Sequence, residues 1–266
     1  MPEKKNDKNF SLEIKTVQSS AFKVLIEALK ELLSDTVIEF DETGLKIVTT
    51  DQSHVILVHL RLYADKFEYY YCEKPMKIGI NMLNFYKIIK TINSNDTLTL
   101  FMNKNDNNKL GVRIENGEKN NRTTFEINLI ELDNLSFEIP PVEFNSVTTM
   151  PSNDFQKIIR DMHNIADTAE IKNTQNEFIL SCTGDFCSQE TVLYNNDFVN
   201  IKNDNNSEII QGIFSLKYLF LFTKCTNLSN HVLIYLKNDY PLIIEYSCAS
   251  LGAIKLCLTQ KIEHES

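Results

Sequence analysis

The sequence predicts an α+β fold built from one folding unit that occurs twice in tandem. The segment VQSSAFKVLIEALKEL (17–32) aligns with MPSNDFQKIIRDMHNI (150–165). With almost the same offset, INMLNFYKIIK (80–90) aligns with FSLKYLFLFTK (214–224). Each half also contains many short strand-like segments and two helical ones, a pattern typical of α+β domains with helices gathered on one side of sheets. Two separated blocks that share nearly one offset indicate a duplicated domain.

The segment EINLIELDNLSFEIPPVEFN (126–145) separates the two halves. Its first residues alternate as in an edge strand, and Pro140-Pro141 excludes a helix and favours an extended chain. With 266 residues, 42% of them hydrophobic, the protein can bury two cores of roughly 120–130 residues each. The predicted boundaries are a charged lead-in at 1–11, domain 1 at 12–127, a connector at 128–145, domain 2 at 146–263 and a tail at 264–266.

The first half begins with an alternating strand at 11–18. Ser19 or Ser20 can cap a helix from about 20 to 33, whose apolar residues share one face. Asn81 is placed to open a second helix at about 82–92. The turn signal DETG (41–44) separates two of the strands. Further strands are predicted near 36–41, 44–50, 54–63, 67–72, 96–102, 109–115 and 122–129.

The second half repeats this order, with helices predicted at 152–165 and 215–225. The asparagine-rich segment NNDFVNIKNDNNSE (195–208) has little to bury, and we expect it to be disordered.

Several chemistries lack a signal in this sequence. It contains no P-loop, no G-x-G-x-x-G and no H-E-x-x-H motif. The five histidines and six cysteines show no metal-ligand spacing, so no catalytic residue, metal or cofactor is predicted and the thiols are expected to be reduced. Apolar runs stay short of the ~18 residues of a membrane span, and the polar start has no secretory signal, so neither membrane insertion nor secretion is expected.

The charge distribution is uneven. The net charge is −9, yet the four predicted helices carry eight bases and only four acids, Glu27, Glu31, Asp154 and Asp161. The two bases of each helix lie three or seven residues apart, which places them on one face. The pattern fits either solvated lysines beside an apolar stripe or a surface for a polyanion, with no aromatic or amide cluster to read its sequence. The bases are Lys23, Lys30, Lys87, Lys90, Lys157, Arg160, Lys217 and Lys224.

Several segments in order carry a family resemblance. They include SLEIKTVQSSAFKVLIEALKEL, TDQSHVILVHL (50–60), LIELDN (129–134), FQKIIRDMHNIAD, LKYLFLFTK, YPLIIEYSCASLG and the terminal QKIEHE. Over roughly 12–264 the chain resembles the proliferating cell nuclear antigen family of DNA sliding clamps. Its asparagine-rich loops and extra lead-in suggest a divergent lineage, such as a protist or a large DNA virus.

The resemblance implies a ring of three identical subunits, with helices on the inner face and β-sheets on the outer face. Twelve helices packed ~9–10 Å apart would leave an opening of about 25–28 Å, enough for duplex DNA. Such a ring is a non-enzymatic processivity factor. Its implied partners are double-stranded DNA of any sequence, DNA polymerase, a clamp loader, and other replication or repair proteins that carry a clamp-binding peptide. Its implied location is the nucleus or a site of viral DNA replication.

The resemblance also assigns site residues. The strand at 123–129, one face of which carries Phe125, Ile127 and Leu129, would pair with a neighbour's strand around 185–193, beside Met162 and Ile165. Partner peptides would dock between the connector and the C-terminal tail, and a bulge or turn near Ser53 would bring His54 beside Leu57. The implied pocket residues are Thr50, His54, Val55, Leu57, Ile139, Pro241, Cys257, Leu258, Gln260 and Ile262.

Four positions depart from the animal family pattern. Thr50, Cys257 and Gln260 stand where animal clamps have a methionine, a tyrosine and a proline, so we expect altered preferences for peptide anchors. Gln175 stands where animal and yeast clamps have the lysine used for ubiquitin conjugation, which puts signalling through that site in doubt.

Two alternatives remain at this point. One is a clamp relative that acts as a monomer or within a mixed ring, which a solution mass would distinguish, at about 31 kDa for a monomer and about 92 kDa for a trimer of 30.7 kDa chains. The other is a Cys/His hydrolase built around His54 or Cys187. The duplication and the basic helices speak against the hydrolase, because neither serves that chemistry.

Overall fold

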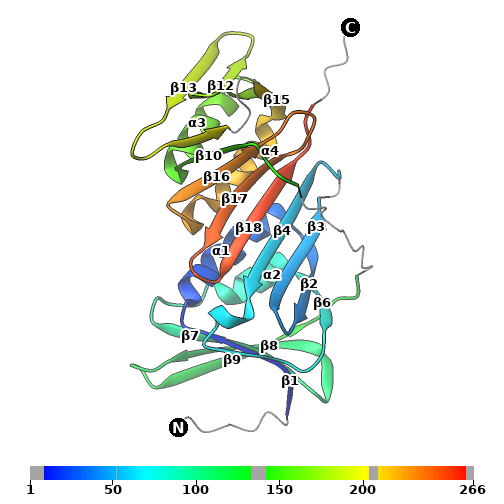
Figure 1. Ribbon diagram of the computed structural model, residues 1–266. Coiled ribbons are helices and arrows are strands. Elements are labelled where there is room, and N and C mark those ends of the chain that lie inside the picture. The colour runs from blue at the N-terminus through cyan, green and yellow to red at the C-terminus, as the bar shows by residue number, and fades with distance from the viewer. Residues whose placement is uncertain (1–8, 52, 133–141, 204–208, 262–266) are drawn as a thin grey trace. The chain divides into compact units, whose positions relative to one another are not determined.

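The computed structural model describes residues 9–51, 53–132, 142–203 and 209–261 (Figure 1). The chain divides into two compact units. Unit 1 comprises 1–49, 60–136 and 248–253, and unit 2 comprises 50–59, 137–247 and 254–266. Most of the predicted lead-in and tail, together with Pro140-Pro141, lies outside the described residues.

Unit 1 is built mainly from the first half of the chain. Its five-stranded antiparallel sheet has the order β5-β1-β7-β8-β9, and a second set of strands follows the order β6-β2-β3-β4. The elements are β1 (Phe10–Thr16), α1 (Ser19–Leu32), β2 (Asp35–Asp41), β3 (Gly44–Thr50), β4 (Ile56–Tyr63), η1 (Ala64–Lys66), β5 (Tyr69–Cys72), β6 (Met76–Asn81), α2 (Met82–Ile89), β7 (Asp96–Asn103), β8 (Asp106–Asn116) and β9 (Asn121–Asn128).

Unit 2 is built mainly from the second half. Its four-stranded sheet has the order β13-β12-β11-β15, and its other strands follow β14-β10-β16-β17-β18, with the start of β4 next to β18. The elements are β10 (Ser146–Pro151), α3 (Ser152–His163), β11 (Thr168–Asn173), β12 (Glu177–Thr183), β13 (Ser188–Tyr194), β14 (Asn200–Asn203), β15 (Ile210–Ser215), α4 (Leu216–Phe222), η2 (Thr223–Leu228), β16 (His231–Leu236), β17 (Leu242–Cys248) and β18 (Gly252–Leu258).

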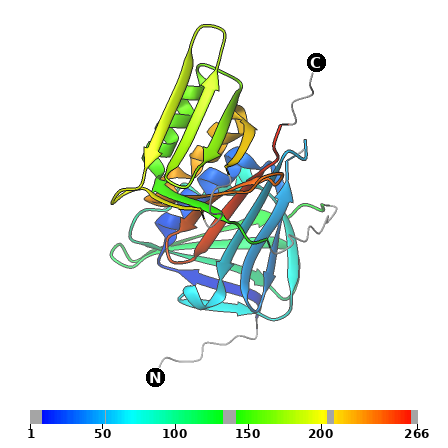
Figure 2. The ribbon, with the colours of Figure 1, turned by 45° about the horizontal axis from the view of Figure 1, so that its top comes forward.

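The predicted α+β duplication is confirmed. Helices α1 and α3 begin at Ser19 and Ser152, and α2 and α4 begin at Met82 and Leu216, so the two pairs share nearly one offset. In each half the order of elements is strand, helix, five strands, helix and three strands, apart from short 3-10 turns. Helices α1 and α2 lie side by side, as do α3 and α4 (Figure 2).

The helix pairs pack through equivalent apolar residues. Phe22 and Phe85 are 2% and 0% exposed, and their rings meet edge to face with centroids 6.3 Å apart. Phe155 is the counterpart of Phe22 in the repeat and is also fully buried. Burying such rings is the main stabilising contribution to each core.

The helix starts confirm one of the two predicted caps and contradict the other. Asn81 caps α2 as predicted, because its side chain accepts a hydrogen bond from the Asn84 amide at 2.9 Å. Neither Ser19 nor Ser20 caps α1, which is preceded by Gln18 and has no side-chain cap. Ser19 is instead buried and donates to the Asp96 carbonyl at 2.5 Å. A tertiary partner outcompetes the local cap.

Two further strands modify the predicted pattern. The short run 76–81 forms β6, which pairs with β2 and was not anticipated. Residues 200–203, expected to be disordered, form β14 and pair with β10. Asn195 supports this strand, because its side chain accepts a hydrogen bond from the Ile201 amide at 2.6 Å. Residues 204–208 lie outside the described part of the chain.

The connector begins at the free edge of β6. The Ile130 amide donates to the Gly79 carbonyl at 3.0 Å, which forms an isolated bridge after β9 ends at Asn128. A Cβ at position 79 would lie 2.2 Å from the Ile130 carbonyl oxygen. Glycine is therefore required for the chain to approach this edge.

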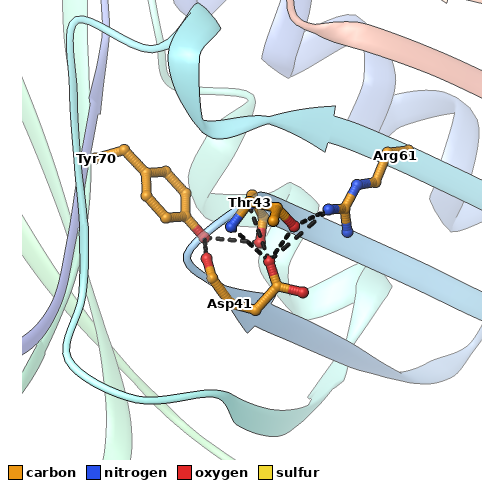
Figure 3. Close-up of polar contacts among 5 residues, drawn as sticks. Asp41, Thr43, Arg61 and Tyr70 are labelled. Carbon is orange, nitrogen blue, oxygen red and sulfur yellow. Dashed lines mark hydrogen bonds and ion pairs between the residues drawn. The ribbon is translucent and has the colours of Figure 1, made fainter.

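The predicted turn at 41–44 is confirmed and tightly held (Figure 3). The Asp41 carboxylate oxygen Oδ1 accepts hydrogen bonds from the Thr43 and Gly44 amides at 2.7 and 3.1 Å. The Arg61 guanidinium nitrogen Nη2 lies 3.7 Å from the same oxygen. Burial alone would raise the pKa of Asp41, but hydrogen bonds from Thr43 and the charge of Arg61 hold it below its usual value. The Tyr70 hydroxyl lies 2.8 and 2.7 Å from the carbonyl oxygens of Asp41 and Gly44.

Gly44→Ala should lower the free energy of unfolding of the protein by more than about 1 kcal/mol. Gly44 has a φ of 141°, and a Cβ there would lie 2.0 Å from the Leu62 carbonyl oxygen. The control is Gly117→Ala, because nothing lies within 4 Å of a Cβ at that position. Urea unfolding of both variants checks the prediction, and equal stabilities would contradict it.

Candidate functional site

Unit 2 contains a surface pocket of about 260 Å³. Its apolar walls come from β4, β17, β18 and the turn before β17, and its polar end comes from the last residue of β3 and the loop between β3 and β4. The lining residues are Thr50, His54, Val55, Ile56, Leu57, Tyr240, Pro241, Ile243, Cys257 and Thr259. Six of them belong to the predicted set.

The loop before β4 is organised by one carboxylate. Asp51 Oδ1 accepts hydrogen bonds from the amides of Val55 and Ile56 at 2.9 and 3.0 Å, and Oδ2 accepts from the Ser53 amide and hydroxyl. Burial alone would raise the pKa of Asp51, but the hydrogen bonds from Ile56, Ser53 and Val55 outweigh it and hold the pKa below its usual value. The carboxylate therefore remains ionised and shapes the loop.

His54 lies at the tip of the turn that this carboxylate stabilises. Its backbone φ is 56°, and its amide donates to the Asp51 carbonyl at 3.1 Å. The His54 ring nitrogen Nδ1 lies 3.0 Å from the Thr50 hydroxyl oxygen. The predicted turn near Ser53 is confirmed, and it brings His54 to the pocket beside Leu57.

The chain after β18 borders the pocket. The Thr259 amide donates to the Val55 carbonyl at 3.2 Å, and Gln260 Nε2 donates to the Tyr240 carbonyl at 3.0 Å. Leu258 was expected to line the pocket, but it is fully buried because its side chain faces the core side of β18. The predicted pocket residues Ile139 and Ile262 lie outside the described residues.

Tyr240 lines the pocket but was not predicted from the sequence. Its ring packs edge to face on Phe144, with centroids 5.6 Å apart, and Phe144 also packs on Tyr235. Its position directly before Pro241 was the available signal. Tyr240 supplies an aromatic wall, whereas the Cys257 wall is a small neutral thiol whose pKa is raised by burial to about 11. Ile56, Ile243 and Thr259 were also missed.

The bases of unit 1 are partly engaged within the unit. Lys23 Nζ donates to the Ile92 carbonyl at 2.9 Å, and Lys30 Nζ binds Glu31 and lies 4.8 Å from the Tyr86 ring centroid. Both lysines are half-buried. Lys87 and Lys90 are exposed. Lys87 lies on α2, and Lys90 directly follows its last residue.

The bases of unit 2 are exposed. They are Lys157 and Arg160 on α3, Lys217 on α4 and Lys224 just after it. The position of Lys23 in the repeat is Gln156, which donates to the Thr223 carbonyl at 3.1 Å. A neutral amide at the position of Lys23 thus also donates to a backbone carbonyl just after the second helix of its unit, although the two acceptors, Ile92 and Thr223, are not equivalent in the repeat.

Aromatic rings lie beside several of these bases, contrary to the sequence expectation. Phe220 stacks on His163 with centroids 5.0 Å apart and lies 4.9 Å from Lys224 Nζ. Tyr218 lies 5.4 Å from Lys217 Nζ. The signal was present in the sequence LKYLFLF of α4.

The predicted interface residues fall in different environments. Phe125 is half-buried on β9, an edge of the five-stranded sheet, and Ile165 is half-buried after α3. Met162 is fully buried, so it cannot contribute surface to an interface. Met162 lies on the buried face of α3, at the position that the core residue Leu29 occupies on α1. The neighbour's predicted strand corresponds to β13, an edge of the four-stranded sheet of unit 2.

The hydrolase alternative finds no support in the geometry. His54 contacts the Thr50 hydroxyl, and the Cys187 thiol is exposed and contacts the Ser188 carbonyl. Within the described ranges, no three His, Cys, Asp or Glu side chains gather closely enough to hold a metal ion. None of the helices in the part of the chain covered by the structure is long and apolar enough to cross a membrane.

Two tandem α+β units, an apolar surface pocket and exposed bases on the helices define a binding scaffold of the sliding-clamp class. Residues 11–136 match the N-terminal domain of proliferating cell nuclear antigen, and residues 138–261 match its C-terminal domain. The chain belongs to the proliferating cell nuclear antigen family of DNA sliding clamps, which are non-enzymatic processivity factors.

A relative described as "Probable DNA polymerase sliding clamp 1", from Paramecium bursaria Chlorella virus 1, is 38% identical over 257 residues. The match covers 95% of this chain and 98% of the relative. This viral relative agrees with the expectation of a divergent, virus-like lineage.

Asp51→Asn should lower the free energy of unfolding by about 1–3 kcal/mol, because it removes the charge that accepts several hydrogen bonds. The native pKa of Asp51 lies below its ordinary value of 3.8. Its stabilisation is therefore complete above that pH and is lost as the pH falls through the native pKa. The difference between wild type and variant should be constant from about pH 5 to 7 and shrink below about pH 4.

Urea unfolding across this pH range measures the effect. The control is Asp65→Asn, the same change at an exposed carboxylate paired with Lys66 at 3.3 Å. A stability difference for Asp51→Asn that grows towards acid pH would contradict the assignment.

Proposed function

We propose that this sliding clamp encircles duplex DNA as a homotrimer and tethers DNA polymerase through the pocket of unit 2. Family membership supports DNA and polymerase as partners and supports oligomerisation. The functional domains in this proposal are 12–127 and 146–263, joined by the connector 128–145. A clamp loader and other replication or repair proteins would use the same ring, in the nucleus or at a site of viral DNA replication.

Two open sheet edges support the trimer. Strand β9 ends one sheet of unit 1, and β13 ends one sheet of unit 2. An edge strand presents unpaired backbone groups that a second chain can complete. Pairing β9 of one subunit with β13 of the next is a head-to-tail contact, and such contacts generate a ring when the rotation closes.

The exposed bases support sequence-independent DNA binding. They can attract phosphates at long range and hold the duplex loosely, because they lie at the ends of flexible side chains. The engaged lysines Lys23 and Lys30 would contribute less than Lys157, Lys217 and Lys224. Processivity then comes from tethering, which raises the effective concentration of polymerase at the primer end.

The pocket supports the docking of a peptide with apolar anchors. Tyr240 supplies an aromatic surface on one wall, and Cys257 leaves more room on another than a tyrosine would. We therefore expect partner peptides whose anchors differ from those of animal partners, with weaker binding of animal-type peptides.

Phe125→Asp should convert the trimer to monomers, because it places a charge in a buried contact between subunits. Analytical ultracentrifugation should give about 92 kDa for wild type, three times 30.7 kDa, and about 31 kDa for the variant. Phe198→Asp is the control, since Phe198 is 71% exposed in a loop of unit 2. A wild-type mass of one chain would favour the monomer or mixed-ring alternative.

Replacing Lys157 and Lys224 with Gln should weaken DNA binding and flatten its dependence on salt, by about 0.9 in the logarithmic slope for each lost phosphate contact. Replacing Lys23 and Lys30 with Gln should change the slope less, because their ammonium groups are engaged within unit 1. Titrations on a nicked circular duplex at several salt concentrations compare the two pairs. Equal slopes for both variants would refute the distinction.

Leu57→Ala combined with Tyr240→Ala should abolish polymerase stimulation while leaving the trimer and its loading on DNA unchanged. Both side chains line the pocket, and truncation removes apolar and aromatic contact area. Leu83→Ala is the control, because Leu83 is 52% exposed on α2 and distant in sequence from the pocket. Stimulation that survives the double change would place the partner site elsewhere.

A further inference from the structure

The loop that carries His54 is hydrogen-bonded to helix α4. The Tyr218 hydroxyl oxygen lies 3.0 Å from Ser53 Oγ. Ser53 also donates its hydroxyl proton to Asp51 Oδ2. A serine hydroxyl has one proton to donate, so Tyr218 is the donor and Ser53 the acceptor in this contact.

The chain of hydrogen bonds that starts at Tyr218 continues from Ser53 to the pocket. Asp51 binds Ser53 through Oδ2, and its Oδ1 binds the amides of Val55 and Ile56 at 2.9 and 3.0 Å. Val55 and Ile56 both line the pocket. The Tyr218 hydroxyl is therefore linked through Ser53 and Asp51 to the backbone that forms the pocket wall.

Tyr218, at the other end of this chain of hydrogen bonds, lies on the packed helix α4. Leu216, Leu219 and Phe222 of α4 are fully buried, so the helix offers Tyr218 a fixed support. The exposed base Lys217 precedes Tyr218, and its ammonium group lies 5.4 Å from the Tyr218 ring centroid. A phosphate that draws Lys217 towards itself would change the environment of this ring.

We infer that Tyr218 is a positioning residue for the peptide pocket and that it couples this pocket to DNA held against α4. The coupling rests on the proposed function, in which the pocket binds peptides and α4 faces DNA. The positioning rests on the hydrogen bonds within unit 2 alone.

Tyr218→Phe tests the positioning, because it removes the hydroxyl and keeps the ring. The probe is a fluorescent peptide that carries a clamp-binding motif and competes with polymerase. Its affinity for the full-length clamp should fall about two- to tenfold, the effect expected of one hydrogen bond. Ser53→Ala removes this hydrogen bond and also the one to Asp51, so its effect should be at least as large, and the double variant should lose no more than Ser53→Ala alone.

Tyr86→Phe is the matched control. It makes the same chemical change on α2, where the Tyr86 hydroxyl donates to Glu27 at 2.9 Å. The peptide affinity of this variant should equal that of wild type. A Tyr218→Phe variant that binds like wild type, or a Tyr86→Phe variant that is weakened equally, would overturn the positioning role.

Amide hydrogen exchange separates this inference from the proposed function. In the free clamp, exchange at Val55 and Ile56 should be faster in Tyr218→Phe than in wild type or Tyr86→Phe. Faster exchange together with no peptide binding by wild type would refute the proposed function and keep the positioning role. Unchanged exchange would refute the positioning role.

The coupling is measured by repeating the peptide titration on clamps loaded on a nicked circular duplex. Peptide affinity of wild type should change on loading, and the change should be lost in Tyr218→Phe. By linkage, peptide should alter DNA retention by the same factor. Wild-type affinity that is equal with and without DNA would overturn the coupling.

Discussion

Burial of one face of each helix is the constraint on which the rest of the structure depends. Phe22, Phe85 and Phe155 are almost completely removed from solvent, and each lies in the packed pair of its own unit. A helix whose apolar stripe is fixed in this way has its remaining face determined as well. The exposure of Lys157, Lys217 and their neighbours is therefore a consequence of core packing, which allows an acidic chain to present basic helices.

The pocket depends on a smaller constraint of a different kind. The Asp51 carboxylate accepts hydrogen bonds from backbone amides of a loop that would otherwise leave them without partners. This arrangement holds His54 at a positive φ. Hydrogen bonds to an ionised acceptor are stronger than neutral ones, so a short polar loop can keep a defined shape at the rim of an apolar surface. The aromatic wall has its own support, because the Phe144 ring packs on both Tyr240 and Tyr235.

Duplication explains both agreements and departures between sequence and structure. The shared offset predicted the helices and their core residues closely. Met162 fits the same comparison, because it occupies the position of Leu29 and both side chains belong to the core of their unit. Equivalent positions can still differ in chemistry. Lys23 and Gln156 occupy equivalent positions and each donates to a backbone carbonyl just after the second helix of its unit, so the charge of Lys23 has no counterpart at that position of unit 2. A base on a helix face is therefore not by itself a contact for DNA.

The sequence by itself determined the α+β duplication, the helices, the turn at 41–44 and six of the pocket residues, because these follow from local periodicity, turn chemistry and the segments of a recognisable family. Only the tertiary structure decided that Ser19 donates to Asp96 instead of capping α1, that Leu258 faces the core, that 200–203 joins β10, and that Tyr240 lines the pocket. Each of these depends on a partner distant in the chain. Local pattern cannot specify such a partner, since the free energy that selects it comes from packing and hydrogen bonds formed only after the chain has folded.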